Sequence, residues 1–332
     1  MKKERVLEII ENFKSKRVAI IGDLMLDEYI WGKASRISPE APVPIVHIKE
    51  RTDCLGGASN VMRNVVTIGG NVSACGVIGD DENGARVREL LASYSINDDC
   101  LFSDSERITI KKQRVMASNQ QLLRIDFEDT CEVKTEYREK IVSKIEELAK
   151  AKEIDAIILE DYAKGLLDVE TAEKINNIAF ENDIFITLDP HPGHPLKTKH
   201  LTLMTPNRME AFGLAGIYHS DKITPVEDDK ALMEVAAKLA KEWAPKYLLI
   251  TLGSQGMALF EKGKEPVIIP TRAREVFDVS GAGDTVIAAF TLGLLGGATG
   301  AEAAEFANNA AGVVVGKVGT VSVDINELLE SF

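Results

Sequence analysis

The amino-acid sequence predicts an α/β fold in which a doubly wound, mostly parallel β-sheet is flanked by helices and carries a small β-sheet lid. Short apolar runs alternate with longer amphipathic stretches along most of the 332 residues, which is typical of a sheet covered by helices on both faces. The runs that predict strands buried on both faces are residues 18–21, 156–159, 184–188 and 247–252. The stretches with apolar residues at helical spacing are residues 136–151, 169–182 and 229–243.

Two segments depart from this pattern and predict the lid. Residues 42–48 and 108–115 look like strands with one solvated face, and the prolines of the first suit a peripheral strand. We expect a separate small sheet, with its strands within about residues 34–50 and 106–127, that also serves as a homodimer surface. The pattern leaves open that both segments are edge strands of the main sheet. No linker or repeat marks a boundary, so we expect one domain over residues 1–332.

The composition argues against several classes of protein. The net charge of −13 is unlike the basic patch of a nucleic-acid-binding protein, and no window of about 18 apolar residues predicts a membrane span. The amino terminus does not resemble a secretory signal. The cysteines form no CxxC pair, so we expect reduced thiols in a cytoplasmic protein. They are Cys54, Cys75, Cys100 and Cys131.

The turn Gly281-Ala282-Gly283-Asp284 is the strongest candidate for a catalytic centre. It precedes an apolar run, residues 286–295, which predicts a buried helix that stops at Gly296-Gly297. The free N–H groups and the positive end of such a helix form an anion hole. Asp284, in the first turn, would accept a proton from an attacking hydroxyl. The alternative is that the glycines allow close packing and Asp284 caps the helix.

The amino-terminal part supplies candidate ligands for a polyol. Asp23 and Asp27 follow the strand at 18–21, and ligands of open α/β sheets bind at the carboxyl ends of strands. Gly56 and Gly57 open a second helical stretch that contains Asn60. An ordinary turn is the alternative at each place.

The middle of the chain supplies further polar residues at strand ends. Asp161 and Lys164 follow the strand at 156–159. Asn207 and Glu210 lie three residues apart at a predicted helix start, where they share a face and could hold Mg²⁺ through water. A helix-capping box explains the same spacing.

Two common nucleotide motifs are excluded. Residues 312–318 resemble a P-loop but are one residue short and lack the Ser/Thr after the lysine, and no GxGxxG follows the first strand. ATP would therefore bind through a different motif. The missing GxGxxG also disfavours a dehydrogenase.

Taken together, these motifs resemble the ribokinase-like (PfkB) carbohydrate kinases over essentially the whole chain. The residues that carry the resemblance are 278–285 (DVSGAGDT), the glycine pair with Asn60, and the NxxE pair Asn207/Glu210. The resemblance implies ATP with Mg²⁺, Asp284 as the base, and Gly281, Ala282 and Gly283 around the anion hole. We assign the nucleotide site to Asn207, Glu210, Thr251, Gly253 and Gly256, with Glu210 as the Mg²⁺ ligand through water. The use of a monovalent cation stays open.

A narrower resemblance concerns the sugar. Residues 35–44, 119–126 and 161–165 are similar to members of the family that phosphorylate D-glycero-β-D-manno-heptose 7-phosphate at O1, on the way to ADP-heptose for the lipopolysaccharide core. Some members are fused to an adenylyltransferase, and we expect a stand-alone kinase here. As a hypothesis, Asp23, Asp27 and Asn60 orient the sugar, with Asp161 nearby. Arg124 and Lys164 are candidates for holding its phosphate, although surface ion pairs explain both equally well.

The sequence departs from that pattern at three positions. His191 stands where a lysine is expected after Asp-Pro, Ser280 replaces a usual threonine, and Glu160 stands where a small polar residue is common. None of them touches the predicted base. The alternatives are another ribokinase-like sugar-phosphate or nucleoside kinase, or a non-catalytic sugar or nucleotide sensor.

Overall fold

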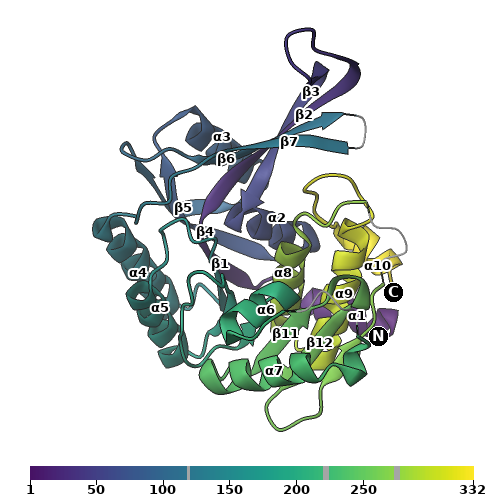
Figure 1. The fold of residues 1–332 in the computed structure, drawn as a ribbon. Helices are drawn as coiled ribbons and strands as arrows, with labels where there is room; N and C mark the ends of the chain where they lie inside the picture. The colour runs from purple at the N-terminus through teal and green to yellow at the C-terminus, as the bar shows by residue number, and fades with distance from the viewer. Residues whose placement is uncertain (118–119, 220–223, 273–276) are drawn as a thin grey trace.

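The computed structural model describes residues 1–117, 120–219, 224–272 and 277–332, and a large sheet lies at its centre (Figure 1). Within these residues the strand order is β13-β12-β11-β10-β9-β8-β1-β4-β5. Neighbouring strands from β11 to β5 run parallel, whereas β12 and β13 are antiparallel. The strands are β1 (Arg17–Gly22), β4 (Asn71–Gly79), β5 (Asn97–Asp104), β8 (Ala156–Glu160), β9 (Phe185–Asp189), β10 (Leu203–Met204), β11 (Tyr247–Thr251), β12 (Met257–Glu261) and β13 (Val267–Ile269).

Helices cover both faces of this sheet, and each face has its own apolar core. Alternate residues of one strand point to opposite faces, so Val18 and Ile20 of β1 enter one core while Ala19 and Ile21 enter the other. The first core is shared with α1 (Lys3–Phe13), α2 (Ala58–Ile68), α3 (Glu82–Ser93), α8 (Ala282–Leu295), α9 (Gly300–Val314) and α10 (Ile325–Glu330). The second is shared with α4 (Thr135–Lys150), α5 (Val169–Glu181), α6 (Arg208–Ala215) and α7 (Lys230–Glu242).

The predicted strands and helices of the main domain are confirmed to within about two residues. The strand predicted at 184–188 is β9 at Phe185–Asp189, and the helix predicted at 136–151 is α4 at Thr135–Lys150. The apolar run after Asp284 is the buried helix α8, which packs between α2 and α9. These segments were predictable because a strand buried between the two cores is a continuous apolar run, and a helix that covers one core has apolar residues at helical spacing.

The lid is a separate sheet, so the alternative of two edge strands is wrong. It rises above the main domain (Figure 1), with the strand order β3-β2-β6-β7. Its long hairpin begins earlier in the chain than predicted, and Asn119, part of the predicted motif at 119–126, lies outside the described residues. The strands are β2 (Leu24–Ile37), β3 (Pro44–Gly57), β6 (Ile110–Ala117) and β7 (Gln120–Phe127).

A single residue, Asp23, connects β1 of the main sheet to β2 of the lid. The returning strand β3 ends at Gly57, whose φ is 55° and where a Cβ would lie 2.6 Å from the Asp23 carbonyl oxygen. Only glycine tolerates this approach. The Ala58 amide then donates to that carbonyl over 3.1 Å. The outgoing and returning chains are thus tied together where lid and domain meet.

None of the described helices combines the length and the hydropathy that a membrane span requires. The structure records Cys54, Cys75, Cys100 and Cys131 as free thiols.

Candidate active site

Asp284 lies in the first turn of α8, at the carboxyl edge of the main sheet. Its side chain is 9% exposed, and each of its oxygens accepts one hydrogen bond. Asn60 Nδ2 donates to Oδ2 over 2.6 Å, and the Tyr162 hydroxyl donates to Oδ1 over 2.9 Å. Burial raises the pKa of Asp284, while these two hydrogen bonds oppose the rise. The carboxylate is thus oriented and keeps a second lone pair on each oxygen for a substrate proton.

The sequence prediction missed Tyr162 as a hydrogen-bond partner of Asp284. Removal from water raises the pKa of its phenol well above the usual value, and the charge of Asp284 raises it further. The hydroxyl therefore keeps its proton and acts as a donor. Nothing in the sequence places the loop after β8 beside a helix 120 residues later, although the loop itself, residues 161–165, was recognised as a motif.

The glycine turn before Asp284 has the geometry of an anion hole, with one of its three amides occupied. Gly281 adopts a φ of 77°, and a Cβ there would lie 2.6 Å from Asn60 Nδ2. The Ala282 amide donates to the Val279 carbonyl over 3.2 Å. Contrary to our expectation, this amide is therefore not available to a ligand. Within the described residues, the amides of Gly283 and Asp284 have no backbone acceptor. A Cβ at Gly283 would meet nothing within 4 Å, which leaves room for a ligand.

Asp27 lies at the site but not where its sequence position suggested. It belongs to lid strand β2 rather than to the end of β1. Its carboxylate forms an ion pair with Arg114 of β6, with 3.0 Å between Nη1 and Oδ1, and accepts a hydrogen bond from the Thr320 hydroxyl over 3.1 Å. Arg63 joins Asn60 to the Thr320 carbonyl. The lid, α2 and the loop before α10 are thus linked around Asp284.

Asp23 organises the loop after β8. Its Oδ2 accepts hydrogen bonds from the amides of Tyr162 and Lys164, over 3.2 and 3.1 Å. Burial raises the pKa of Asp23 to about 6, and the backbone amides, first that of Lys164, oppose the rise. Asp161 is the first residue of that loop, and its Oδ2 lies 2.9 Å from Nδ1 of His194. Asp23 therefore positions the chain segment that carries Tyr162.

The two cations predicted to hold a sugar phosphate both have carboxylate partners. Lys164 Nζ lies 2.8 Å from Glu128 Oε2. Arg124, on the exposed strand β7, pairs with Asp126 through two contacts of 2.9 Å. His191, in the loop after β9, accepts a hydrogen bond from the Gly193 amide within its own turn.

Lys112, which the sequence prediction did not single out, projects from lid strand β6 toward Asp284, whose pKa its charge lowers. Its Nζ lies 5.4 Å from the centre of the Tyr162 ring. Burial lowers the pKa of Lys112 while the charge of Asp27 opposes this shift. The sequence carried only a partial signal: residues 111–114 are four consecutive polar residues in a predicted strand, and every second one lies on the same face.

Three carboxylates gather beside Asp284, from the ends of β8 and β9 and from α6. Burial, followed by repulsion between the carboxylates, raises the pKa of Glu160 and of Asp189 well above the usual values, and burial raises that of Glu210. Asn207 and Glu210 form the capping box that was the alternative to a Mg²⁺ site: Glu210 Oε2 accepts from the Asn207 amide over 2.8 Å, and Asn207 Oδ1 accepts from the Glu210 amide over 3.0 Å.

The remaining residues assigned to the nucleotide lie at the end of β11. Thr251 donates its amide to the Pro206 carbonyl over 3.1 Å and forms a bridge with Asn207. Gly253 and Gly256 both have positive φ. A Cβ at Gly256 would lie 2.0 Å from the Ile269 carbonyl oxygen, whereas a Cβ at Gly253 would meet nothing within 4 Å. Gly256 thus serves the turn, and Gly253 leaves open space.

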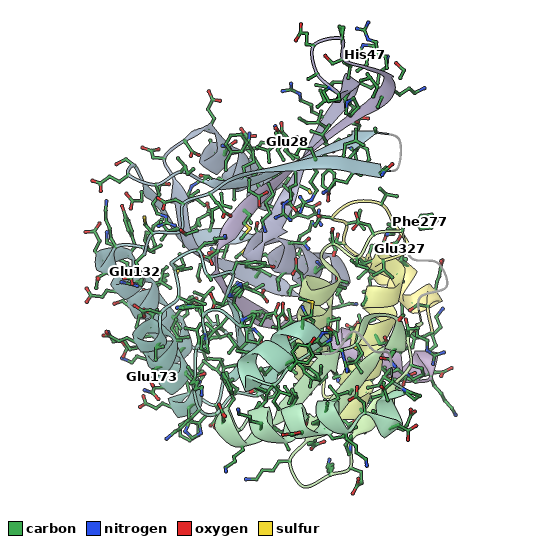
Figure 2. The ribbon with its side chains drawn as sticks, in the orientation of Figure 1. Glu28, His47, Glu132, Glu173, Phe277 and Glu327 are labelled. Carbon is green, nitrogen blue, oxygen red and sulfur yellow. The ribbon has the colours of Figure 1, made fainter. Side chains whose placement is uncertain are left out.

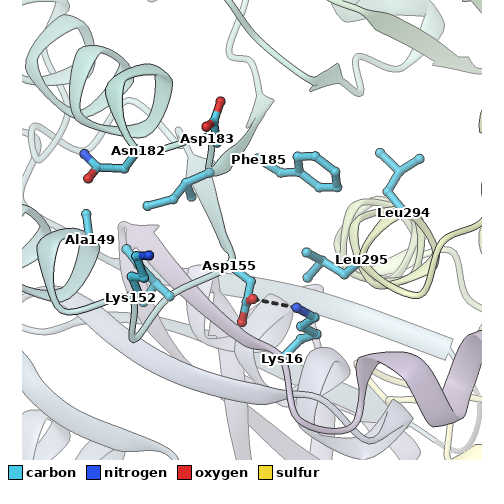
Figure 3. Close-up of a pocket in the computed structure, with 11 residues that line it drawn as sticks. Lys16, Ala149, Lys152, Asp155, Asn182, Asp183, Phe185, Leu294 and Leu295 are labelled. Carbon is cyan, nitrogen blue, oxygen red and sulfur yellow. Dashed lines mark hydrogen bonds and ion pairs between the residues drawn. The ribbon is translucent and has the colours of Figure 1, made fainter.

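A pocket of about 330 Å³ lies at the other edge of the sheet (Figure 3). It is lined by Lys16 and Asp155, which form an ion pair of 2.8 Å, and by Phe185 and Leu295. The amino ends of β1, β8 and β9 border it, so it is remote from Asp284.

The chain matches the pfkB family of carbohydrate kinases over residues 15–326. It belongs to this family, which confirms the predicted fold and the prediction of an ATP-dependent carbohydrate kinase.

Curated relatives match almost the whole chain. The "Bifunctional protein HldE" of Desulfatibacillum aliphaticivorans is 42% identical over 316 residues, which is 95% of this chain and 63% of that protein. The protein of the same name from Sulfurimonas denitrificans is 41% identical over 327 residues, or 98% and 65% of the two chains. The chain therefore spans less than two thirds of the length of these relatives.

Solved structures share the fold at low identity. Arabidopsis thaliana ribokinase complexed with ribose and ATP has a TM-score of 0.69 and 20% identity, with coverage of 95% of this chain and 98% of that one. Escherichia coli phosphofructokinase-2 in complex with substrates and products has a TM-score of 0.76 and 16% identity, with coverage of 95% and 97%.

Proposed function

We propose that this kinase transfers the γ-phosphoryl group of ATP to O1 of D-glycero-β-D-manno-heptose 7-phosphate and releases the 1,7-bisphosphate. We choose a phosphorylated acceptor because the face of the lid that is turned toward Asp284 carries several cations. Lys112, Arg114 and Arg124 lie on that face, which is turned toward the base. The resemblance of residues 35–44 and 161–165 to kinases of this heptose phosphate supports the particular sugar.

The strand register explains why these three cations share one face. Lys112 of β6 is the register partner of Asp27 in β2 and of Asp126 in β7, and Arg114 is the partner of Arg124. Register partners, and residues two positions apart on one strand, project to the same side of a sheet. The face that carries Asp27 therefore also carries all three cations.

Lys112 is the cation of this group that is available to a ligand. Arg114 is paired with Asp27 and Arg124 with Asp126. Lys112 has no carboxylate within ion-pair distance among the described residues. A phosphate dianion on the acceptor would supply the missing counter-charge, and charge-assisted contacts of this kind are the strong ones. The sugar would then lie between Lys112 and Asp284.

The chemistry proposed for this arrangement is in-line transfer with a general base. Asp284 accepts the proton of the O1 hydroxyl as that oxygen attacks the γ-phosphorus, and ADP leaves. Asn60 and Tyr162 hold the carboxylate in position. The amides of Gly283 and Asp284 stabilise charge on the transferring group, where the loss of one donor typically costs about 10²–10³ in rate.

The residues at the edge fit the divalent cation that such a reaction uses. Glu210 employs one oxygen in its capping box, which leaves the other for a ligand, and its charge raises the pKa of the nearby Asp189. Such oxygens are what Mg²⁺ prefers. Glu210 would hold the ion through water, and an ion bound there would neutralise charge on the ATP phosphates. The use of ATP, together with free thiols, supports a cytoplasmic location.

A panel of acceptors tests the proposal. ADP release is measured with heptose 7-phosphate, the unphosphorylated heptose, fructose 6-phosphate, ribose and adenosine. We expect kcat/KM to be highest by at least tenfold for heptose 7-phosphate. A higher value for another sugar phosphate or a nucleoside would replace the acceptor and keep the kinase. Absence of turnover with every acceptor would favour a sensor.

We also propose that the chain forms a homodimer through the lid. Strand β7 is an edge strand exposed along its whole length, and an unprotected edge of this kind is a template for pairing. Its side chains Leu123, Ile125 and Phe127 are 54%, 37% and 44% exposed. They alternate with Arg124 and Asp126, so the apolar face is the one turned away from the site. A second lid packed on it would cover both the edge and the apolar face.

A further inference from the structure

Arg63, on α2, is a buried cation to which the proposed reaction gives no role. It is 5% exposed. One nitrogen, Nη2, donates to Asn60 Oδ1 over 2.6 Å and to the Thr320 carbonyl over 3.0 Å, while Nε has no hydrogen-bond partner among the described residues. Burying a charge costs free energy unless the charge is paired, so an arginine at this position indicates that the site uses its charge or its hydrogen bonds.

Among the described residues, the hydrogen-bond partners of Arg63 carry no negative charge. They are a side-chain amide and a backbone carbonyl. The Cys54 thiol also lies near, but burial, the largest influence, raises its pKa to about 11, and the charge of Arg63 lowers this pKa only in part. The thiol therefore keeps its proton. One side chain, that of Asn60, connects the guanidinium to the carboxylate of Asp284.

Arg63 determines which way the amide of Asn60 points. A guanidinium has only donors, so the atom of Asn60 that faces it must be the oxygen. The nitrogen then faces Asp284 and donates to Oδ2 over 2.6 Å. Asn60 is 0% exposed, so its amide takes its partners from the protein. Without Arg63 the amide could turn over and set its oxygen against the carboxylate, and that contact between two acceptors is repulsive.

We propose that Arg63 is a positioning residue for the proposed reaction, because it locks the Asn60 amide with the nitrogen presented to Asp284. Its hydrogen bonds go to Asn60 and Thr320, so it acts on Asp284 through Asn60. Its charge polarises the amide, and hydrogen bonds arranged in a chain strengthen one another. The carboxylate therefore receives a stronger and better directed hydrogen bond. This inference rests on the proposed function in taking Asp284 as the base, and it holds for any acceptor.

The ionisation of Asp284 depends on several groups, of which Arg63 acts on one. Burial raises the pKa of Asp284 most, and the hydrogen bond from Asn60 is the largest influence that lowers this pKa. If the amide turned over, this influence would be lost and the pKa would rise further. A base must be ionised to accept a proton, so activity would then begin at a higher pH. The titratable groups that face Asp284 are Asp27 of β2, Lys112 of β6, Glu160 of β8, Tyr162 of the loop after β8 and Asp189 of β9.

The test is the pH dependence of ADP release by Arg63→Met, which keeps much of the side-chain length without donors or charge. The assay uses the acceptor with the highest kcat/KM in the panel. We expect kcat to fall about tenfold, with KM for both substrates within about twofold, because the hydrogen bond to a charged group is weakened. The acidic limb of the kcat profile should move up by about one pH unit, which is the shift that a tenfold change corresponds to. Arg63→Lys keeps the charge and a donor, so kcat should recover to within about threefold.

Arg138→Met on α4 is the matched control. Arg138 is 8% exposed and pairs with Asp168 over 2.7 Å, and α4 covers the opposite face of the main sheet from α2. This variant also loses a buried cation, so its thermal unfolding temperature should fall while kcat and the pH profile stay those of the unchanged protein. Equal changes of kcat and pH profile in both variants would assign Arg63 a structural role only.

A second comparison shows whether Arg63 acts through Asn60. In the Asn60→Ala background, Arg63→Met should lower kcat no further, because the effects of residues in one hydrogen-bond network are not additive. The inference is overturned if Arg63→Met leaves kcat and the pH profile unchanged, or if its effect is as large in the Asn60→Ala background. If Arg63→Met does not fold, Arg63→Gln replaces it, and the acidic limb should still move up because the charge is lost.

Failure of the proposed function gives different results. Another acceptor in the panel changes only the substrate of this assay. Near-normal turnover of Asp284→Asn, or absence of turnover with every acceptor, would remove the base and this inference with it. Normal kinetics of Arg63→Met beside an inactive Asp284→Asn would remove the inference alone.

Discussion

The Tyr162 hydroxyl donates a hydrogen bond to Oδ1 of Asp284 over 2.9 Å. The donor belongs to the loop after β8 and the acceptor to the first turn of α8, so the contact joins two halves of the carboxyl edge. Together with Asn60 on the other oxygen, it fixes the carboxylate plane. The carboxylate of Asp284, the proposed base, is therefore oriented before any substrate binds.

Replacing the base should abolish turnover and preserve binding. In Asp284→Asn the amide cannot accept the hydroxyl proton, and general bases of this kind contribute roughly 10²–10⁴-fold. We expect kcat to fall about 10³-fold or more, with dissociation constants for ATP and sugar phosphate within about threefold by calorimetry. Near-normal turnover would show that Asp284 is not the base.

Removing the Tyr162 hydroxyl should have a smaller and more selective effect. Tyr162→Phe keeps the ring beneath Lys112 but loses one hydrogen bond to a charged group, worth about 1.5–3 kcal/mol. We expect kcat to fall about 10–100-fold with little change in KM for ATP. Tyr218→Phe is the control, because that side chain is 89% exposed. Equal kinetics of both variants would remove Tyr162 from the site.

Lys112 should discriminate between acceptors that carry a phosphate and those that do not. Lys112→Met keeps much of the volume and loses the charge, so kcat/KM for the sugar phosphate should fall about 10–100-fold, as expected for a charge-assisted contact. Turnover of the unphosphorylated sugar should stay within about twofold. Lys111→Met is the matched control, because the adjacent residue of β6 faces the other side and lies over the Phe127 ring. A similar loss with both acceptors would contradict the assignment.

Asp23 should make the stability of the protein depend on pH in an identifiable window. Its pKa is about 6 in the folded protein and 3.8 as the ordinary value. The unfolded chain therefore releases this proton first as the pH rises, and stability falls between about pH 4 and pH 6. The difference of about 2 units corresponds to about 3 kcal/mol.

Urea unfolding of Asp23→Asn beside the unchanged protein isolates this contribution. The free energy of unfolding of the variant, relative to the unchanged protein, should rise by about 3 kcal/mol from pH 4 to pH 7. Other carboxylates titrate in both proteins and cancel in the difference. A difference that is flat over this range would mean that the pKa of Asp23 is not raised.

A charge on the outer face of the lid should separate the proposed dimer. Leu123→Glu places a carboxylate in the apolar face of β7, and we expect sedimentation velocity to show a dimer for the unchanged protein and a monomer for the variant. Leu7→Glu on α1 is the control, because Leu7 is similarly exposed, at 48%, but lies outside the lid. A monomeric unchanged protein would contradict the proposal.

The sequence predicted the main sheet, and it pointed to Asp284 as the candidate base, because both inferences depend on local signals. Apolar runs of fixed period specify β8 or α8, and a glycine turn before a buried helix points to Asp284 without knowledge of distant residues. Asp27 was expected just beyond the carboxyl end of the strand at 18–21 but lies within lid strand β2, because nothing local shows that the chain crosses into the lid directly after Asp23. The Ala282 amide was expected to be free, and its bond to Val279 depends on the conformation of the turn.

The residues that were missed lie at the site because of strand pairing and contacts between distant parts of the chain. Lys112 faces the base because β6 pairs with β2 in one particular alignment. Thr320 contacts Asp27 across 293 positions of the chain. Residues 111–114 are four consecutive polar residues. Which of them face inward depends on the pairing of strands, which one sequence does not reveal.

The one-residue passage from β1 to β2 has a mechanical consequence. Asp23 is bound to Ala58 through its carbonyl and to the loop at 162–164 through its carboxylate. We expect the lid to move as one rigid body that pivots about Asp23, inside the site. A tilt at its far end, near His47 (Figure 2), must be taken up around Asp23, and it displaces the loop that carries Tyr162. Enclosing the sugar and aligning the proton-accepting oxygen would then be one movement.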